Sequence, residues 1–386
     1  MKFSSHPLWL VGFRPFFALA CLSGLSLPVL WALVFSQTVS LPENSFTAIQ
    51  WHAHEMFFGF GWAVLGGFLL TSTKNWTNIR GYHGNTLIFL VAVWLFERAG
   101  MWFGGAWPPL LFRVSNNLFL VSVVAMLLWT LIRHRKTDSY RDNYFFLIVL
   151  PLFLISKNLM LSAEYFQTGW SMALGLFRMA FLVMLERTLS TFMKSAFQVA
   201  ILRNPLLDKT IKLTGLALVV ESVMPPVVAA WLSLLLALLL LGRLFYWKPK
   251  LAMQRLDIGI VYLGYLAIVA QLLIEFLKYF AFPGLGGSVS VHVFTFGVMG
   301  MVIPSMIIRI TKGHTGRKVV FDALDIWVLR IMIVAFFIRV IAPQLYPTAY
   351  PYWISLAAAC WFASYAIIGW RYIPFVLEKR VDGKEH

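Results

Sequence analysis

The chain has 386 residues, of which 60% are hydrophobic and only 12% are charged. Soluble globular domains carry about 25% charged residues, so this composition excludes an ordinary soluble protein and predicts an integral membrane protein. The net charge of +16 is a basic excess of the kind that also occurs in nucleic-acid-binding proteins. The two cysteines, Cys21 and Cys360, lie within apolar segments, so no disulfide framework is expected.

Apolar segments follow one another along almost the whole sequence, with short polar connections between them. A membrane-spanning helix needs about 20 apolar residues, and about twelve segments approach that length. The seventh is the shortest, and Pro225-Pro226 closes it. We therefore expect an all-α polytopic membrane protein with about twelve transmembrane helices, forming a single transmembrane domain over residues 1–386. The expected spans are 15–36, 51–72, 84–103, 109–132, 143–162, 169–190, 211–224, 226–247, 256–280, 288–310, 325–343 and 351–375.

The basic residues are concentrated in alternate connections between these spans. Most of the 32 lysines and arginines lie near the two termini or in every second connection. The intervening connections carry none, for example 37–50, 163–168, 281–287 and 344–350. By the positive-inside rule, both termini are expected in the cytoplasm. The basic excess is then a topology signal and an attraction for anionic lipids, so we expect the lipid bilayer as partner and no nucleic acid.

Two distant segments share the pattern His-x-x-x-Phe-Gly. One runs from His54 to Gly59 in the second expected span, and the other from His292 to Gly297 in the tenth. Imidazole is the commonest protein ligand for metals, and ionisable groups inside apolar spans mark functional candidates because they are costly there. Two helices with histidines at one depth and glycines beside them could clamp a porphyrin through two axial imidazoles. The alternative is that small residues and histidines simply pack two membrane helices together.

His52 precedes His54 by two residues, which places the two side chains about 200° apart on a helix. His52 is therefore a candidate for a separate role. Glu55 could orient a ligand histidine or pair with an arginine. Further candidates for supporting a ligand or for charge pairing are Arg14, Glu97, Arg98, Arg178 and His314. Three charged residues at span ends, Arg113, Lys157 and Lys278, are explained equally well by a functional role and by snorkelling to the membrane interface. Three histidines, His83, His134 and His314, are expected in inner loops.

Several short sequence motifs follow one another along the chain in a defined order. They are Gly12-Phe13-Arg14-Pro15-Phe16-Phe17, Trp51-His52-Ala53-His54-Glu55-Met56, Gly67-Phe68-Leu69-Leu70-Thr71, Asn75-Trp76-Thr77, His292 with Phe294, Thr295 and Gly297, and Gly313-His314-Thr315-Gly316-Arg317. Together they resemble the NnrS family of bacterial membrane proteins over essentially the whole chain. The resemblance implies a haem- and copper-containing protein of about twelve spans in the bacterial inner membrane, tied to nitric oxide stress and denitrification.

One position departs from the pattern that the resemblance implies. Tyr262 stands before Leu263-Gly264-Tyr265 in the ninth expected span, where a histidine is expected. If that histidine ligates copper in relatives, the departure weakens the expectation of copper in this chain.

We therefore expect haem b bound through His54 and His292, with His52 as a candidate copper ligand or alternative axial ligand. The expected function is nitric oxide handling, meaning binding, sensing or turnover, and an oxidoreductase activity with an unidentified electron donor stays open. The alternatives are a secondary transporter, in which buried charges line an anion or proton path, and a haem or copper assembly factor. No phosphate-binding glycine loop or nucleophile elbow occurs in the sequence to indicate a nucleotide-driven pump or a hydrolase.

Overall fold

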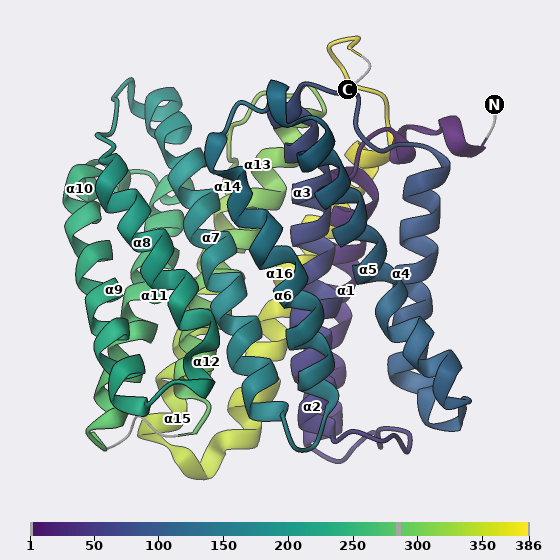
Figure 1. Ribbon diagram of the computed structural model, residues 1–386, viewed down its shortest axis with the longest axis vertical. Coiled ribbons are helices and arrows are strands. Elements are labelled where there is room, and N and C mark those ends of the chain that lie inside the picture. Colours follow the sequence, from purple (N-terminus) through teal and green to yellow (C-terminus); the bar gives the residue numbers. More distant parts are fainter. Residues whose placement is uncertain (1–2, 283–286, 385–386) are drawn as a thin grey trace. The chain divides into compact units, whose positions relative to one another are not determined.

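The structure is a computed structural model that describes residues 3–282 and 287–384. Within these residues the chain is predominantly helical and contains no strand (Figure 1). Ten helices among the described residues are long and apolar enough to cross a membrane. This confirms the expected all-α polytopic membrane fold, while the cytoplasmic orientation of the termini stays a prediction.

The ten candidate spans coincide with ten of the expected segments. They are α1 (Phe13–Phe35), α2 with η3 and α3 (Ala48–His54, Glu55–Gly61 and Trp62–Thr77), α4 (Asn85–Phe103), α5 (Pro109–Arg133), α6 (Tyr144–Leu161), α7 (Phe166–Phe197), α9 (Pro226–Tyr246), α11 (Leu256–Tyr279), α12 with η8 and α13 (Val289–Phe294, Thr295–Gly300 and Met301–His314), and α16 (Tyr350–Leu377). Two short elements precede α1, namely η1 (Phe3–Ser5) and η2 (Pro7–Trp9). Others lie between the longer helices, namely η4 (Gly104–Ala106), η5 (Arg135–Thr137), η6 (Arg141–Asn143), α10 (Pro249–Ala252), α15 (Ala342–Leu345) and η9 (Pro347–Ala349).

The two other expected spans are helical but fall outside these ten. At the seventh expected span, α8 (Pro205–Ala217) has 13 residues and passes into the 3-10 segment η7 (Leu218–Val223), whose backbone is non-helical at Val220. At the eleventh, α14 (Ala323–Val340) has 18 residues. Its sequence carries Asp325, Arg330 and Arg339, which lower its apolar character.

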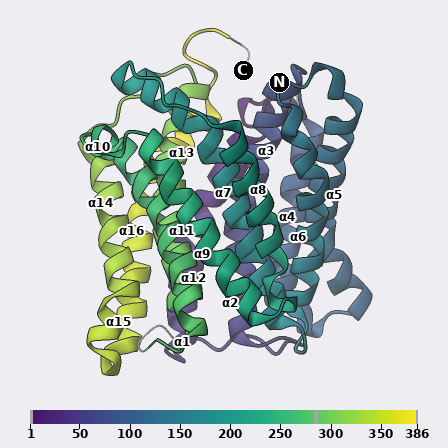
Figure 2. The same ribbon diagram turned by 60° about the vertical axis from the view of Figure 1, so that its left-hand side comes forward.

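The described chain divides into two compact units. Unit 1 contains Met1–Phe166, Ile307–Val320 and Tyr365–His386, and unit 2 contains Gln167–Met306 and Phe321–Ser364. In unit 1, α1 packs along α3, and α5 packs against α3, α4 and α6 (Figure 1). In unit 2, α9 lies along α11, with α8 against α9 (Figure 2). The expectation of one domain over residues 1–386 stays a prediction.

Two spans are interrupted by a π-helical turn. In unit 1, η3 follows His54 directly, and in unit 2, η8 begins three residues after His292. π-turns are rare and occur frequently at functional sites. The repeated His-x-x-x-Phe-Gly pattern therefore corresponds to the same backbone irregularity in both units.

Glycine makes the packing of α1 on α3 possible. A Cβ atom added at Gly67 would lie 2.7 Å from Cβ of Phe16, and one added at Gly12 would lie 2.6 Å from Cβ of Leu70. Small residues at such positions let membrane helices approach closely. The start of α1 is also held by a hydrogen bond of 2.9 Å from the backbone N–H of Phe13 to Oγ1 of Thr71.

We predict that Gly67→Ala destabilises the protein, because the new methyl group must push α1 away from α3. Overpacking of this kind costs about 1–3 kcal/mol, and the midpoint of thermal unfolding in detergent measures it. Gly242→Ala is the matched control, since a Cβ there meets nothing within 4 Å and alanine favours helix by up to about 1 kcal/mol. Equal midpoints for the two variants would contradict the role of Gly67.

Candidate functional site

His54 is placed by a firmly anchored short helix. Thr47 and Gln50 form a capping box at the start of α2, in which each side chain accepts a hydrogen bond from the other's backbone N–H. Nε2 of Gln50 also donates to the backbone carbonyl of Met160 at 3.3 Å, which ties α2 to α6. His54 closes α2 and is fully buried, with its ring 5.5 Å from that of Phe58.

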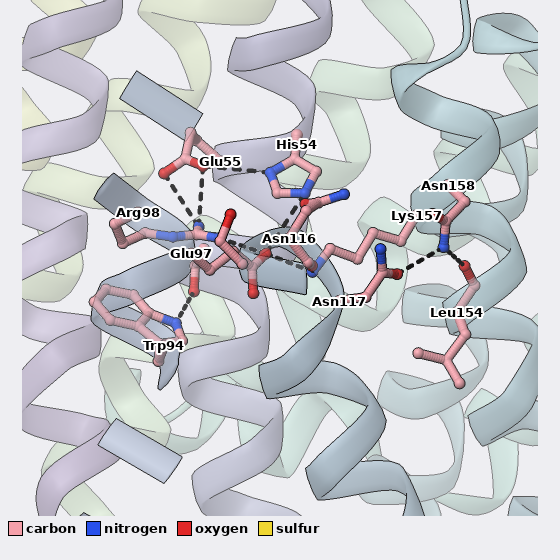
Figure 3. A network of polar contacts seen from close by, with 12 residues as sticks. His54, Glu55, Trp94, Glu97, Arg98, Asn116, Asn117, Leu154, Lys157 and Asn158 are labelled. Atoms are coloured by element: carbon pink, nitrogen blue, oxygen red, sulfur yellow. Dashed lines mark hydrogen bonds and ion pairs between the residues drawn. The ribbon is translucent and has the colours of Figure 1, made fainter. Parts of the chain in front are cut away.

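Four charged side chains surround His54 in unit 1 (Figure 3). Glu55 comes from η3, Glu97 and Arg98 come from α4, and Lys157 comes from α6. Glu97 and Lys157 are fully buried, Glu55 is almost so, and only 13% of the Arg98 side chain is exposed. Two acids therefore face two bases, and the buried cluster has no net charge when all four are ionised.

Glu97 is the centre of this network. Nζ of Lys157 donates to Oε1 of Glu97 at 2.5 Å and also to the backbone carbonyl of Asn116. Nη2 of Arg98 lies 2.6 Å from the same Glu97 oxygen, while its Nη1 donates to Oε2 of Glu55 at 3.1 Å. Charges taken out of water are tolerated only when each is compensated at close range. The cluster meets that condition with side chains from three helical segments.

The π-turn makes room for Arg98. A Cβ atom at Gly59, inside η3, would collide with Nη1 of Arg98. The carbonyl of Gly59 accepts a hydrogen bond of 3.3 Å from Nε1 of Trp94, and the Arg98 guanidinium lies 5.2 Å from the centre of the Trp94 ring. Glycine at this position therefore lets the guanidinium lie directly on the backbone of the turn.

The imidazole of His54 has one engaged nitrogen and one nitrogen without a hydrogen bond. Nδ1 lies 3.3 Å from Oε1 of Glu55, whereas Nε2 lies 3.6 Å from Oε1 of Glu97 and makes no hydrogen bond. The Asn116 amide also approaches His54, yet its Oδ1 makes no hydrogen bond of ordinary geometry. A carboxylate at Nδ1 favours the tautomer with the lone pair on Nε2. A buried polar atom without a partner is rare, so Nε2 is the atom best suited to hold a ligand.

A cavity of about 660 Å³ lies in unit 1, bounded by η4, the start of α5 and the end of α6. Its walls include the polar side chains of Asn116, Asn117 and Asn158. Nδ2 of Asn158 donates to Oδ1 of Asn117 at 2.9 Å across the α5–α6 contact. Asn116 belongs both to this wall and to the His54 cluster (Figure 3). The cavity therefore reaches the buried cluster at Asn116.

His292 occupies the corresponding place in unit 2 with different partners. Its Nδ1 lies 2.7 Å from the Ser288 carbonyl, so Nδ1 carries the proton and donates. Its Nε2 accepts from Nη2 of Arg339 at 3.1 Å, and the same nitrogen of Arg339 donates to the Tyr350 hydroxyl. In a histidine that binds a metal, the other ring nitrogen typically donates to a carbonyl or carboxylate. Nδ1 of His292 is held in this way, but Nε2, the nitrogen that would bind, already accepts a hydrogen bond from Arg339. Because His54 and His292 belong to different units, the two-imidazole clamp stays a prediction.

The remaining candidates take separate positions. The His52 ring stacks on Trp31 of α1 at 4.1 Å, so it faces a different helix from His54, as their spacing predicts. In unit 2, Nη1 of Arg178 donates to Oε1 of Gln271 at 2.9 Å. Tyr262, at the position where the family pattern suggests histidine, donates its hydroxyl to the Trp247 carbonyl at 2.6 Å. Among the described residues, no three His, Cys, Asp or Glu side chains gather to hold a metal ion.

One expectation from the sequence was wrong, and one alternative that the sequence left open is decided. His314 was expected in an inner loop, but it is the last residue of α13 and its ring lies 5.4 Å from that of Phe13. The helix continues beyond the apolar stretch through Arg309 and Lys312. For Lys157, the sequence left snorkelling to the interface and a buried role equally possible, and the structure has it fully buried against Glu97. The sequence does contain a signal for this buried role, because Ser156, Lys157 and Asn158 form a polar group within an otherwise apolar helix.

We predict that Lys157→Met destabilises the protein by about 3–5 kcal/mol, because it leaves the two buried carboxylates facing one base. The double variant Lys157→Met with Glu97→Gln should recover most of this loss, since Glu55 and Arg98 then remain as a balanced pair. Thermal unfolding of the full chain in detergent measures both. A double variant as unstable as the single one would show that charge balance is not what holds the cluster.

We also predict that the cavity floor is open to water. In a chain with Cys21→Ala and Cys360→Ala, Asn116→Cys should react with a small water-soluble methanethiosulfonate, because Asn116 lines the cavity. Phe119→Cys, one turn away and 1% exposed, should stay unlabelled in the same mass-spectrometric measurement. Labelling of Asn158→Cys on the exposed wall without labelling of Asn116→Cys would contradict a continuous cavity.

Comparison with known proteins gives a match to one protein-family model. No curated protein matches the chain. The family model described as NnrS protein matches residues 7–380, which is nearly the whole chain. The match covers both units and includes His52, His54 and His292. The chain therefore belongs to the NnrS family.

Proposed function

We propose that the protein binds haem b within the membrane through His54 and handles nitric oxide at that centre. Membership of the NnrS family suggests a membrane protein related to nitric oxide and to haem and copper. The observation that carries the proposal is the fully buried imidazole of His54, whose Nε2 makes no hydrogen bond. An imidazole nitrogen with a free lone pair is the axial ligand that haem iron takes most often.

The residues around His54 fit this role. Glu55 at Nδ1 orients the ring and increases the basicity of Nε2. Arg98 and Lys157 hold Glu97 on the Nε2 side and neutralise its charge. A bound haem supplies an iron atom at which nitric oxide can coordinate. The chain contributes the ligand nitrogen, a water-poor environment and a cavity that reaches Asn116.

His292 is the second ligand candidate, in unit 2. Its Nδ1 is fixed by the Ser288 carbonyl, which is the arrangement a ligand needs. To bind a metal through Nε2, Arg339 must first leave that nitrogen. His52, stacked on Trp31, has its ring face covered. Because no group of three or more His, Cys, Asp or Glu side chains gathers among the described residues, we propose no set of copper ligands.

We further propose that the protein lies in the bacterial inner membrane with both termini in the cytoplasm. The alternation of basic and uncharged connections supports this orientation. It places the 660 Å³ cavity on the outer side. The partners are then the lipid bilayer and nitric oxide, with an electron donor needed only if the centre turns over.

We predict that the full chain purified from haem-replete cells shows a b-type haem spectrum that shifts on addition of nitric oxide. His54→Ala should lower the haem-to-protein ratio at least tenfold while the protein still inserts into the membrane. His292→Ala should also lose haem if His292 supplies a ligand. His134→Ala, at the end of α5, is the control and should keep its haem.

The outcomes separate the alternatives. A colourless, iron-free wild-type protein would contradict haem binding and favour a transporter whose buried charges line an ion path. Haem that exchanges readily with free haem or apoprotein would favour an assembly factor. Full haem retention in His54→Ala would remove His54 from the ligand set.

A further inference from the structure

The cavity of unit 1 is large enough to hold a ligand of its own. Its walls come from parts of the chain that are far apart in the sequence, namely the segment 43–45 before α2, the turn η4, the start of α5 and the end of α6. Its volume of about 660 Å³ lies within the range of small-molecule sites, about 300–1,000 Å³. Such sites combine apolar walls with a few placed polar groups, and the polar groups indicate which ligand fits.

Contacts within the chain hold the segment 43–45 in place at the cavity. Nδ2 of Asn44 donates to the carbonyl of Pro42 at 2.8 Å. A Cβ atom added at Gly105 would collide with the backbone carbonyl of Glu43, so the glycine lets this segment lie directly on η4. Preorganised groups lose less entropy on binding than mobile ones. The segment is therefore a fixed wall that carries polar groups.

One cation and one anion line this cavity without pairing. Arg113 belongs to α5, and Glu43 belongs to the segment 43–45. Among the described residues, neither side chain has a hydrogen-bond or ion-pair partner, and both are exposed. Snorkelling explains an arginine at the end of a span, but it does not explain an acid at the same cavity. A molecule that carries both an anionic and a cationic group can bridge the two charges.

A buried hydrogen-bond acceptor follows the acid in the sequence. Oδ1 of Asn44 is buried and makes no hydrogen bond, whereas Nδ2 of the same amide is engaged by Pro42. That bond identifies which atom of the amide is the oxygen. A buried polar atom without a partner is rare, and a ligand can satisfy this one only with an N–H or O–H donor. A primary ammonium group has three such donors and also carries the charge that Glu43 needs.

We propose that the cavity of unit 1 binds a molecule with a primary ammonium group and an anionic oxygen group. Glu43 and Asn44 take the ammonium group, and Arg113 takes the anionic group, because a guanidinium forms charge-assisted hydrogen bonds with carboxylate and phosphate. Two sources offer this chemistry. One is the headgroup of phosphatidylethanolamine, and the other is a free amino acid or short peptide. The site uses none of the residues assigned to haem and is independent of that function.

The test uses the full-length protein in detergent. Native mass spectrometry compares phosphatidylethanolamine with phosphatidylcholine, whose ammonium group has the same charge but no N–H donor. Isothermal titration compares alanine, dialanine and trialanine with N-acetyl-trialanine amide, which has neither charge. We expect at least tenfold preference for phosphatidylethanolamine if the source is lipid, or at least tenfold tighter binding of an uncapped compound if the source is soluble. Absence of both preferences would overturn the proposal.

Labelling locates the bound molecule in the cavity. In the chain with Cys21→Ala and Cys360→Ala, the preferred compound should slow methanethiosulfonate labelling of Asn158→Cys at least fivefold, because Asn158 lines the cavity. Lys136→Cys, exposed after the other end of α5, is the control and should be labelled at an unchanged rate. Equal slowing at both positions, or slowing at neither, would refute the site.

Charge variants identify the groups that bind. Arg113→Gln and Glu43→Gln should each weaken binding of the preferred compound fivefold or more, and both side chains are exposed, so the helices keep their packing. Glu164→Gln, exposed in the connection after α6, is the matched control for Glu43→Gln and should change binding less than twofold. If Glu164→Gln weakened binding as much as Glu43→Gln, the effect would come from general surface charge and the assignment would be wrong.

Discussion

Compensation of buried charge is the constraint on which unit 1 depends. Glu97 is fully buried, and an ion in that position is tolerated only with opposite charges in contact. Lys157 and Arg98 provide those charges from two helices, and Glu55 compensates the second positive charge of the pair. The helices α4 and α6 and the turn η3 are therefore held by one network as well as by apolar packing. His54 stands within this network, which fixes its ring.

The backbone irregularity and the charge network depend on each other. A regular α-helix satisfies its carbonyls internally, whereas the π-turn η3 offers the Gly59 carbonyl to Trp94. The missing side chain at Gly59 then gives space to Arg98, which in turn reaches Glu55 and Glu97. A larger residue at position 59 would therefore disturb the turn, the arginine and the histidine together.

The sequence was sufficient to predict features that depend on composition and on repeated local patterns. It was not sufficient to predict which residues from distant parts of the chain are in contact. Apolar length located the spans, and the repeated pattern selected His54 and His292. Glu55, Glu97 and Arg98 were named as pairing candidates, but Glu97 and Lys157 are 60 residues apart, and nothing local in the chain states that they meet. Nor could the sequence show that Arg339 occupies Nε2 of His292.

The His54 cluster leaves buried atoms of two kinds without a hydrogen bond. Nε2 of His54 and Oε2 of Glu97 can offer lone pairs, whereas Nε of Arg98 is an N–H donor. A lone pair on imidazole is what a metal ion takes from a protein. Because the acids and bases around His54 are already paired with one another, a ligand at Nε2 does not have to compensate a net charge of the cluster. The charge network therefore does two things at once: it makes the burial of Glu97 possible, and it leaves the imidazole nitrogen as the atom suited to a metal.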